Sequence, residues 1–161
     1  MGKRSTKSQK NIYQQSREAA GMTRESASEA LQFVSADRIE RIESEKTEPH
    51  PEEVLAMSNC YKNFSLCNYY CSNECPIGQQ YVPEVQLKDL SQITLEMLHS
   101  LNVLEREKNR LIDITVDGVI SKDEQEDFHR IRQRLEEISL AVEALQLWVQ
   151  QAAAEGRIGN G

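Results

Sequence analysis

The fold of this chain is decided by residues 17–43, which read REAAGMTRESASEALQFVSADRIERIE. Gly21 is placed to end a helix that begins near Asn11, because glycine readily adopts the left-handed conformation common at helix C-termini. Thr23 and Ser35 each precede a run with helical spacing of apolar residues, and their side chains can accept a hydrogen bond from the first turn of a helix. The stretch therefore predicts three short helices joined by tight turns.

The residues on either side extend this pattern. Ile39 and Ile42 lie three residues apart, so both point to the same face of the third helix. Pro51 suits the first turn of a further helix, which we expect over residues 52–61. Residues 1–10 are basic and polar, and we predict that they form a disordered arm ahead of the helices.

Residues 11–63 contain several short matches at fixed spacing to a known family. The matching positions are residues 17–24, 34–35, 41–43 and 46–49. Through them the segment resembles the helix-turn-helix domain of the lambda-repressor/Cro (Xre) type, an all-α domain of five short helices. The resemblance implies a transcriptional regulator, here expected to be a repressor, that binds double-stranded DNA by placing its third helix in the major groove.

The resemblance also implies which residues contact DNA. Arg38 is the favoured base reader, because arginine bonding the guanine edge is the commonest specific contact. Arg24 and Lys46 are expected to meet phosphates. The other candidate base readers lie at the start or on the outer side of the third helix, and they are Ser35, Ala36, Asp37, Glu40 and Arg41.

Two departures from the family pattern leave a second function open. The third helix carries Asp37 and Glu40, and an acidic side chain that faces phosphate is repelled by it. The Asn-Gly that usually follows this helix is Ser44-Glu45 here. The alternative is a protein–protein adaptor that keeps the scaffold but no longer binds DNA, since a fold does not fix its function.

All four cysteines lie in one short stretch, at Cys60, Cys67, Cys71 and Cys75. On one continuous helix they would be spread over roughly 22 Å, which is too long for a single metal ion. We therefore expect a break at Asn63 in the left-handed conformation, followed by a short helix with Cys67 and Cys71 one turn apart. A break of this kind would let the four thiols converge.

Three roles for these cysteines remain open. A four-cysteine zinc site would stabilise the segment, although zinc knuckles usually contain pairs spaced C-x2-C. An iron–sulfur cluster is the second role, since the Cys75-Pro76 step is similar to the end of ferredoxin-type cysteine runs. Packed or redox-active thiols are the third, because free cysteine is among the most buried residue types.

The C-terminal half predicts a helical hairpin over residues 84–152, after a joint and linker at 64–83 and before a flexible tail at 153–161. A seven-residue apolar repeat marks each helix. In the first it comprises Leu90, Met97, Leu104 and Leu111, and the second contains Phe128, Ile131, Leu135, Ile138, Val142, Leu145 and Val149. A lone hairpin leaves much of its apolar seam exposed, so we expect a homodimer through this half.

The turn of this hairpin, residues 113–124, matches an EF-hand calcium loop at several positions. A capped turn accounts for the same residues: Gly118 ends one helix, and Ser121 with Glu124 forms a capping box for the next. The capped turn is favoured. The hairpin and the cysteine run together also resemble those of small bacterial helix-turn-helix regulators, which again implies regulation.

Composition bounds the function further. The chain has 161 residues and a net charge of −7. The acidity lies mostly in the C-terminal half, so the N-terminal half is nearly neutral. No apolar run is long enough to span a membrane, and no signal peptide follows the basic start, so we expect a cytoplasmic protein. The three histidines are dispersed and no nucleophile–base pattern occurs, which argues against an enzyme.

Overall fold

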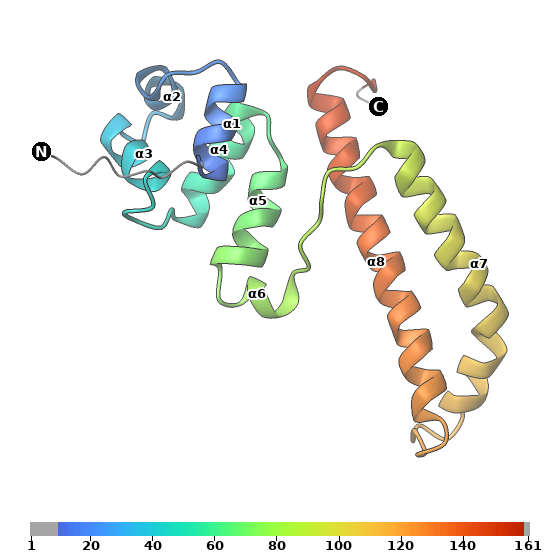
Figure 1. Ribbon diagram of the computed structural model, residues 1–161. Helices are drawn as coiled ribbons and strands as arrows, with labels where there is room; N and C mark the ends of the chain where they lie inside the picture. Colours follow the sequence, from blue (N-terminus) through green and yellow to red (C-terminus); the bar gives the residue numbers. More distant parts are fainter. Residues whose placement is uncertain (1–9, 160–161) are drawn as a thin grey trace, which may run out of the picture. The chain divides into compact units, whose positions relative to one another are not determined.

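The computed structural model describes residues 10–159, whose regular structure is entirely helical (Figure 1). The chain divides into two compact units, residues 1–84 and 85–161. The expected all-α fold is confirmed. Within the described part no helix is both long and apolar enough to cross a membrane. The predicted basic arm lies, apart from Lys10, outside the described residues.

The N-terminal unit begins with four helices and continues through the cysteine stretch. The first four are α1 (Ile12–Ala19), α2 (Arg24–Leu31), α3 (Ala36–Glu43) and α4 (Pro51–Tyr61). They are followed by α5 (Ser65–Tyr69), a π-helical turn η1 (Tyr70–Glu74) and α6 (Gly78–Tyr81). The residues expected to form a joint at 64–83 are thus partly helical, and they pack in the same unit as α1–α4.

Side-chain caps fix where the first helices begin. The Asn11 side chain accepts a hydrogen bond from the backbone N–H of Gln14. Thr23 and Ser26 form a reciprocal capping box at the start of α2. Ser35 accepts from the N–H of Arg38 at the start of α3. Each cap satisfies an N–H that a helix leaves without an intrahelical partner, which is why these short helices start where the sequence predicts.

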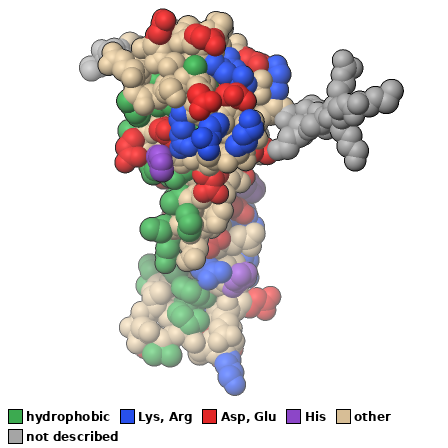
Figure 2. Space-filling view, turned by 90° about the vertical axis from the view of Figure 1, so that its left-hand side faces the viewer, with side chains coloured by type: hydrophobic (Ala, Val, Ile, Leu, Met, Phe, Trp, Pro, Cys, Tyr) green, Lys and Arg blue, Asp and Glu red, His purple; other side chains and the backbone are tan. Residues whose placement is uncertain are grey.

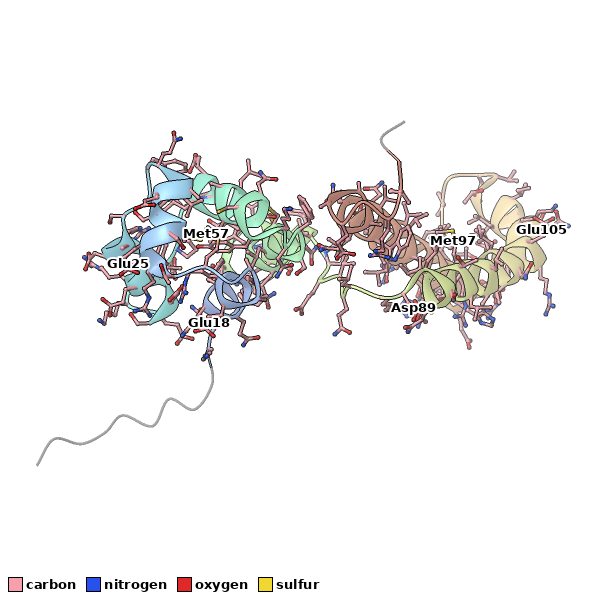
Figure 3. All side chains as sticks on the ribbon, turned by 90° about the horizontal axis from the view of Figure 1, so that it is seen from above. Glu18, Glu25, Met57, Asp89, Met97 and Glu105 are labelled. Carbon is pink, nitrogen blue, oxygen red and sulfur yellow. The ribbon has the colours of Figure 1, made fainter. Side chains whose placement is uncertain are left out.

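The core of this unit lies between α1, α2, α3, α4 and α5. Met57 is 1% exposed and lies among these helices (Figure 3). Leu66 of α5 is fully buried in the same cluster. The other buried apolar members of the cluster are Tyr13, Ala27, Leu31, Val34, Ile39, Ile42, Val54 and Tyr61. The cysteine-bearing segment therefore contributes to the core of the helix-turn-helix unit.

The break after α4 differs by one residue from the expected one. Lys62, not Asn63, adopts the left-handed conformation, with φ 54° and ψ 37°. Asn63 has a different role: its side-chain oxygen accepts from the N–H of Ser65, and its amide donates to Ser16 Oγ at 2.8 Å. Asn63 thus joins the first residue of α5 to Ser16 of α1, a link that local sequence patterns do not reveal.

The end of the expected joint and linker at 64–83 contains the short helix α6. Gly78 is buried at its start, and a Cβ placed on it would lie 1.9 Å from the carbonyl oxygen of Cys71. The backbones of α6 and η1 therefore approach each other more closely than any residue with a side chain allows. This packing explains a helix that has no apolar periodicity of its own.

The C-terminal unit consists of α7 (Leu90–Thr115) and α8 (Gln125–Ala154), which pack together along their length. Cross-helix contacts join Ser100 to Glu137, Glu107 to Arg130, and Arg110 to Asp127. As the residue number rises along α7, the number of its partner on α8 falls, so the two helices are antiparallel.

Fewer apolar residues of α8 are buried against α7 than the heptad pattern predicts. Ile131, Ala141 and Ala144 are buried, whereas Leu135 and Val142 are 44% and 38% exposed. Some apolar residues of the seven-residue repeat on α8 are therefore buried in the hairpin, and others are exposed to solvent. Between the helices, the N–H and the hydroxyl of Ser121 donate to Glu124 at 3.0 and 2.6 Å. These bonds lie within the turn, because α7 ends at Thr115 and α8 begins at Gln125 without a side-chain cap, so the expected capping box does not start α8.

Candidate functional site

The turn between α2 and α3 sets the angle of the two helices. Gln32 ends α2 with a positive φ of 63°, and Val34, which is 1% exposed, anchors the turn in the core. Ile39 and Ile42 bury the inner face of α3. The outer face of α3 is therefore held at the surface by packing on one side only, as a helix that enters a DNA groove must be.

A buried ion-pair network holds the end of α3. The Glu43 side chain is 1% exposed. Its two oxygens accept from Arg17 Nε at 2.6 Å and Nη2 at 3.0 Å, and from Arg24 Nε at 2.8 Å. Both arginines thus neutralise a carboxylate inside the unit, and hydrogen bonding to Glu43 raises the pKa of Arg17. Arg24 remains partly exposed and can still meet a phosphate.

Arg38 is engaged within the domain. Its Nε and Nη2 donate to the two carboxylate oxygens of Glu53 at 2.9 and 2.8 Å. Its Nη1 donates to Thr47 Oγ1 at 2.8 Å, and Nη2 also donates to the Glu48 carbonyl at 2.9 Å. The sequence favoured Arg38 as a base reader, but the structure turns its guanidinium toward α4 and the preceding loop.

The remaining candidate residues lie around the outer face of α3. Arg41 is exposed and makes no ion pair with any residue between 10 and 159. Lys46 Nζ lies 3.3 Å from Glu40 Oε1, so these two residues form an ion pair. Asp37 and Ser35 are exposed and Ala36 is half-buried. Basic and acidic side chains are intermingled on this face of the N-terminal unit (Figure 2).

The four cysteines fall into two groups. Cys60 of α4 packs on the core with its sulfur 3.8 Å from the Met22 sulfur, and burial raises the pKa of its thiol. Cys67 lies on α5, Cys71 lies on η1, and Cys75 is the residue that ends η1. Burial raises the pKa of Cys71, and the neighbouring thiols Cys75 and Cys67 raise it further.

Metal binding by these cysteines stays a prediction. Across residues 10–159, no three His, Cys, Asp or Glu side chains are arranged so that they could hold a metal ion. Cys60 contacts a thioether, and its raised pKa favours the protonated thiol, whereas zinc binds thiolates. A four-thiolate site would require Cys60 to leave this contact.

One contact that the sequence did not predict joins the cysteine segment to α1. The Tyr13 hydroxyl donates to Glu74 Oε2 at 2.8 Å, and the Tyr13 and Tyr69 rings meet edge to face with centroids 6.3 Å apart. Burial raises the pKa of both Tyr13 and Glu74. The two bonded residues are 61 positions apart, so no local pattern could have revealed the pair.

Comparison with known proteins supports the assignment made from this geometry. Residues 14–66 match the model of the family described as "Helix-turn-helix". Neither the curated proteins nor the solved structures gave a match. The matched range begins in α1 and ends at Leu66 in α5, and it contains α2, the turn and α3. Residues 14–66 of this chain are therefore a helix-turn-helix domain of the lambda-repressor/Cro type, the kind found in DNA-binding regulators.

Proposed function

We propose that this protein is a sequence-specific DNA-binding transcriptional regulator that acts as a dimer and represses its target. The observation that carries the proposal is the exposed position of Arg41 on α3, on a helix whose opposite face is fixed by Ile39 and Ile42. An unpaired guanidinium at this position can bond a guanine edge in the major groove. Arg24 and Lys46 flank α3 and would contact phosphates.

The outer N-terminal turn of α3 completes the proposed reading surface. Ser35, Ala36 and Asp37 lie there, and a carboxylate such as Asp37 can accept from the amino group of cytosine. Asp37 also repels phosphate, so the surface should bind random DNA weakly. A surface of this kind depends more on base contacts than on charge, which suits a specific regulator.

Dimerisation is proposed to occur through the hairpin. Leu135, Val142 and Val149 recur every seven residues on α8 and are each about two-fifths exposed. Leu98 and Leu101 of α7 are exposed as well. A seven-residue stripe of this kind is the surface that coiled-coil helices bury against a partner, and a second copy of the chain supplies the same stripe.

Modulation through the cysteines is proposed to act on α1. Cys71 and Cys75 flank Glu74, whose carboxylate holds the hydroxyl of Tyr13. A peroxide that oxidises two of the thiols to a disulfide and is itself reduced to water and an alcohol, or zinc bound by the thiolates, would rearrange this segment and release that bond. The displacement would reach the helix-turn-helix core through Tyr13 and Leu66.

Selection from double-stranded oligonucleotides tests the DNA-binding proposal. A randomised core of about 20 base pairs spans two half-sites one helical turn apart. Purified protein should enrich a two-fold symmetric sequence, and Arg41→Ala should lower affinity for it at least tenfold, about the value of one bidentate base contact. Arg132→Ala, an exposed arginine on α8, is the matched control. Enrichment of no sequence would overturn the proposal.

A second candidate function is favoured by one observation. Asp37 and Glu40 give α3 an acidic outer side, and Arg38 is turned inward. A helix of this character suits contact with a basic protein surface, so a protein–protein adaptor is the alternative function. If no DNA sequence is enriched, and charge-reversed Asp37→Lys and Glu40→Lys variants lose a copurifying protein, the adaptor function replaces the regulator.

A further inference from the structure

Arg38 and Glu53 join the first turns of two helices. Arg38 is the third residue of α3, and Glu53 is the third residue of α4. The guanidinium and the carboxylate meet side by side in two parallel hydrogen bonds of 2.9 and 2.8 Å. Their side chains are only 24% and 11% exposed. A bidentate pair of this geometry fixes the direction of approach as well as the distance.

Glu53 is also held by a hydrogen bond at the start of its own helix. One of its oxygens, Oε2, accepts from the backbone N–H of His50 at 2.7 Å, which caps the start of α4. The same oxygen receives Nη2 of Arg38. Hydrogen bonding from Arg38 lowers the pKa of Glu53, so the carboxylate stays ionised at neutral pH. Glu53 is thus a hydrogen-bond acceptor for Arg38 whose position is fixed by the start of α4.

Arg38 also orders the loop between α3 and α4. Its remaining hydrogen bonds reach Thr47 Oγ1 and the carbonyl of Glu48. Lys46, the phosphate-contacting candidate, precedes these residues directly. One guanidinium therefore ties together the start of α3, the loop that carries Lys46, and the start of α4. To reach a base, Arg38 would have to give up all of these bonds.

We propose that Arg38 is a positioning residue for DNA recognition, and that it acts through Glu53 rather than by reading a base. The inference rests on the proposed DNA-binding function. Glu53 is 8% exposed and both of its carboxylate oxygens are bonded within the domain, so we expect it to make no contact with DNA. Sequence-specific affinity should nevertheless depend on Glu53 as strongly as on Arg38, because either change releases α3 and the loop together.

A double-mutant cycle on the full-length protein tests this inference. The variants are Arg38→Gln, Glu53→Gln and the double variant, and affinity is measured for the duplex enriched by wild-type protein and for a scrambled duplex. Each single change should lower affinity for the enriched duplex about tenfold, the usual effect of a charge-assisted hydrogen bond. The double variant should bind no more weakly than the weaker single variant, since both changes break one interaction.

Two further readouts separate positioning from loss of folding. Circular dichroism fixes a temperature at which every variant is folded, and Arg38→Lys supplies a milder change that keeps the charge. Affinity for the scrambled duplex should fall by less than affinity for the enriched duplex, because only the phosphate contact of Lys46 in the released loop is weakened there. Selection repeated with Glu53→Gln should enrich the wild-type bases. Arg132→Gln and Glu136→Gln, an exposed ion pair on α8, should alter neither affinity.

Two results would overturn the inference. In the first, Glu53→Gln binds like wild type while Arg38→Gln loses its preference at one base pair, which would make Arg38 a base reader. In the second, the two single changes add in the double variant. Failure of the proposed function looks different, because wild-type protein would then enrich no sequence, and this inference would fall with it.

Discussion

Glu43 at the end of α3 is bound by Arg17 of α1 through two hydrogen bonds, at 2.6 and 3.0 Å. The Arg17 side chain is 7% exposed and the Glu43 side chain 1%, so the pair lies in the interior. Removing one partner of a buried pair leaves the other as an unpaired buried charge, which costs much more than the intact pair contributes.

Glu43→Ala should therefore lower the free energy of unfolding by about 3–5 kcal/mol. Urea titration followed by circular dichroism measures the loss. Glu40→Ala removes a neighbouring carboxylate that is 41% exposed and pairs with Lys46, and it should change stability by less than about 1 kcal/mol. Similar losses in both variants would contradict the structural role given to Glu43.

Glu74→Gln should change how stability depends on pH. Burial holds the pKa of Glu74 above its ordinary value, despite the bond from Tyr13. A raised folded-state pKa contributes stability that is fully present below the unfolded pKa and lost as pH rises through the folded pKa. The glutamine variant lacks this loss, so it should gain on wild type as pH rises from the acid range to neutral.

Urea midpoints for wild type and Glu74→Gln across that pH range measure the effect. The amide oxygen of glutamine can still accept from Tyr13, so the contact itself is retained. Glu29→Gln, on the exposed side of α2, controls for the loss of one charge. Parallel curves for wild type and Glu74→Gln would show that burial does not perturb this carboxyl.

Gly78→Ala should destabilise the cysteine segment. The added methyl would lie 1.9 Å from the Cys71 carbonyl oxygen, and this neighbour is backbone, so α6 must move away from η1. Overpacking of this kind costs about 1–3 kcal/mol. Near-ultraviolet circular dichroism should also change, because Tyr69 and Tyr70 lie in the displaced segment.

Gly159→Ala is the matched control for that experiment, since nothing lies within 4 Å of its added methyl. It should leave both the urea midpoint and the tyrosine signal unchanged. A Gly78→Ala variant as stable as wild type would mean that α6 does not pack against η1 in solution.

If the protein dimerises through α8 as proposed, Val142→Glu should give a monomer while keeping the hairpin helical. Val142 is 38% exposed in the single chain, so a charge there meets solvent in the monomer but would be buried against a partner. Sedimentation equilibrium measures the mass, and circular dichroism the helix content. Gln133→Glu, also exposed on α8, should leave the mass unchanged. A wild-type protein that sediments as a monomer would contradict the proposed dimer.

The local features of the fold were predictable from the sequence. Thr23, Ser35 and Pro51 each act within one turn of chain, so their effect on helix starts depends on few distant residues. The helix α6 was not predictable, because Gly78 owes its place to the Cys71 carbonyl rather than to periodicity. The left-handed residue after α4 is Lys62, while the Asn63 side chain bonds Ser65 and the distant Ser16, a contact that local patterns do not reveal.

The candidate site was predictable in outline only. Family matches located α3 and its outer face, which includes Arg41. Periodicity also places Arg38 near that face, and only the tertiary structure shows that Glu53, fifteen positions away, captures it. On α8 the heptad pattern gave the apolar stripe, but it could not show that Val142 faces away from α7.

The burial of Leu66 has a consequence for how the chain can be divided. Its side chain is 0% exposed and belongs to the buried cluster that otherwise comes from α1 to α4 and the turn before α3. Tyr13 of the same cluster also contacts Glu74 and Tyr69. A fragment ending at residue 63 would lack Leu66, and its core would be exposed to water there. The smallest fragment that folds on its own should therefore extend through α6, which would make the thiols and α3 parts of one folding unit.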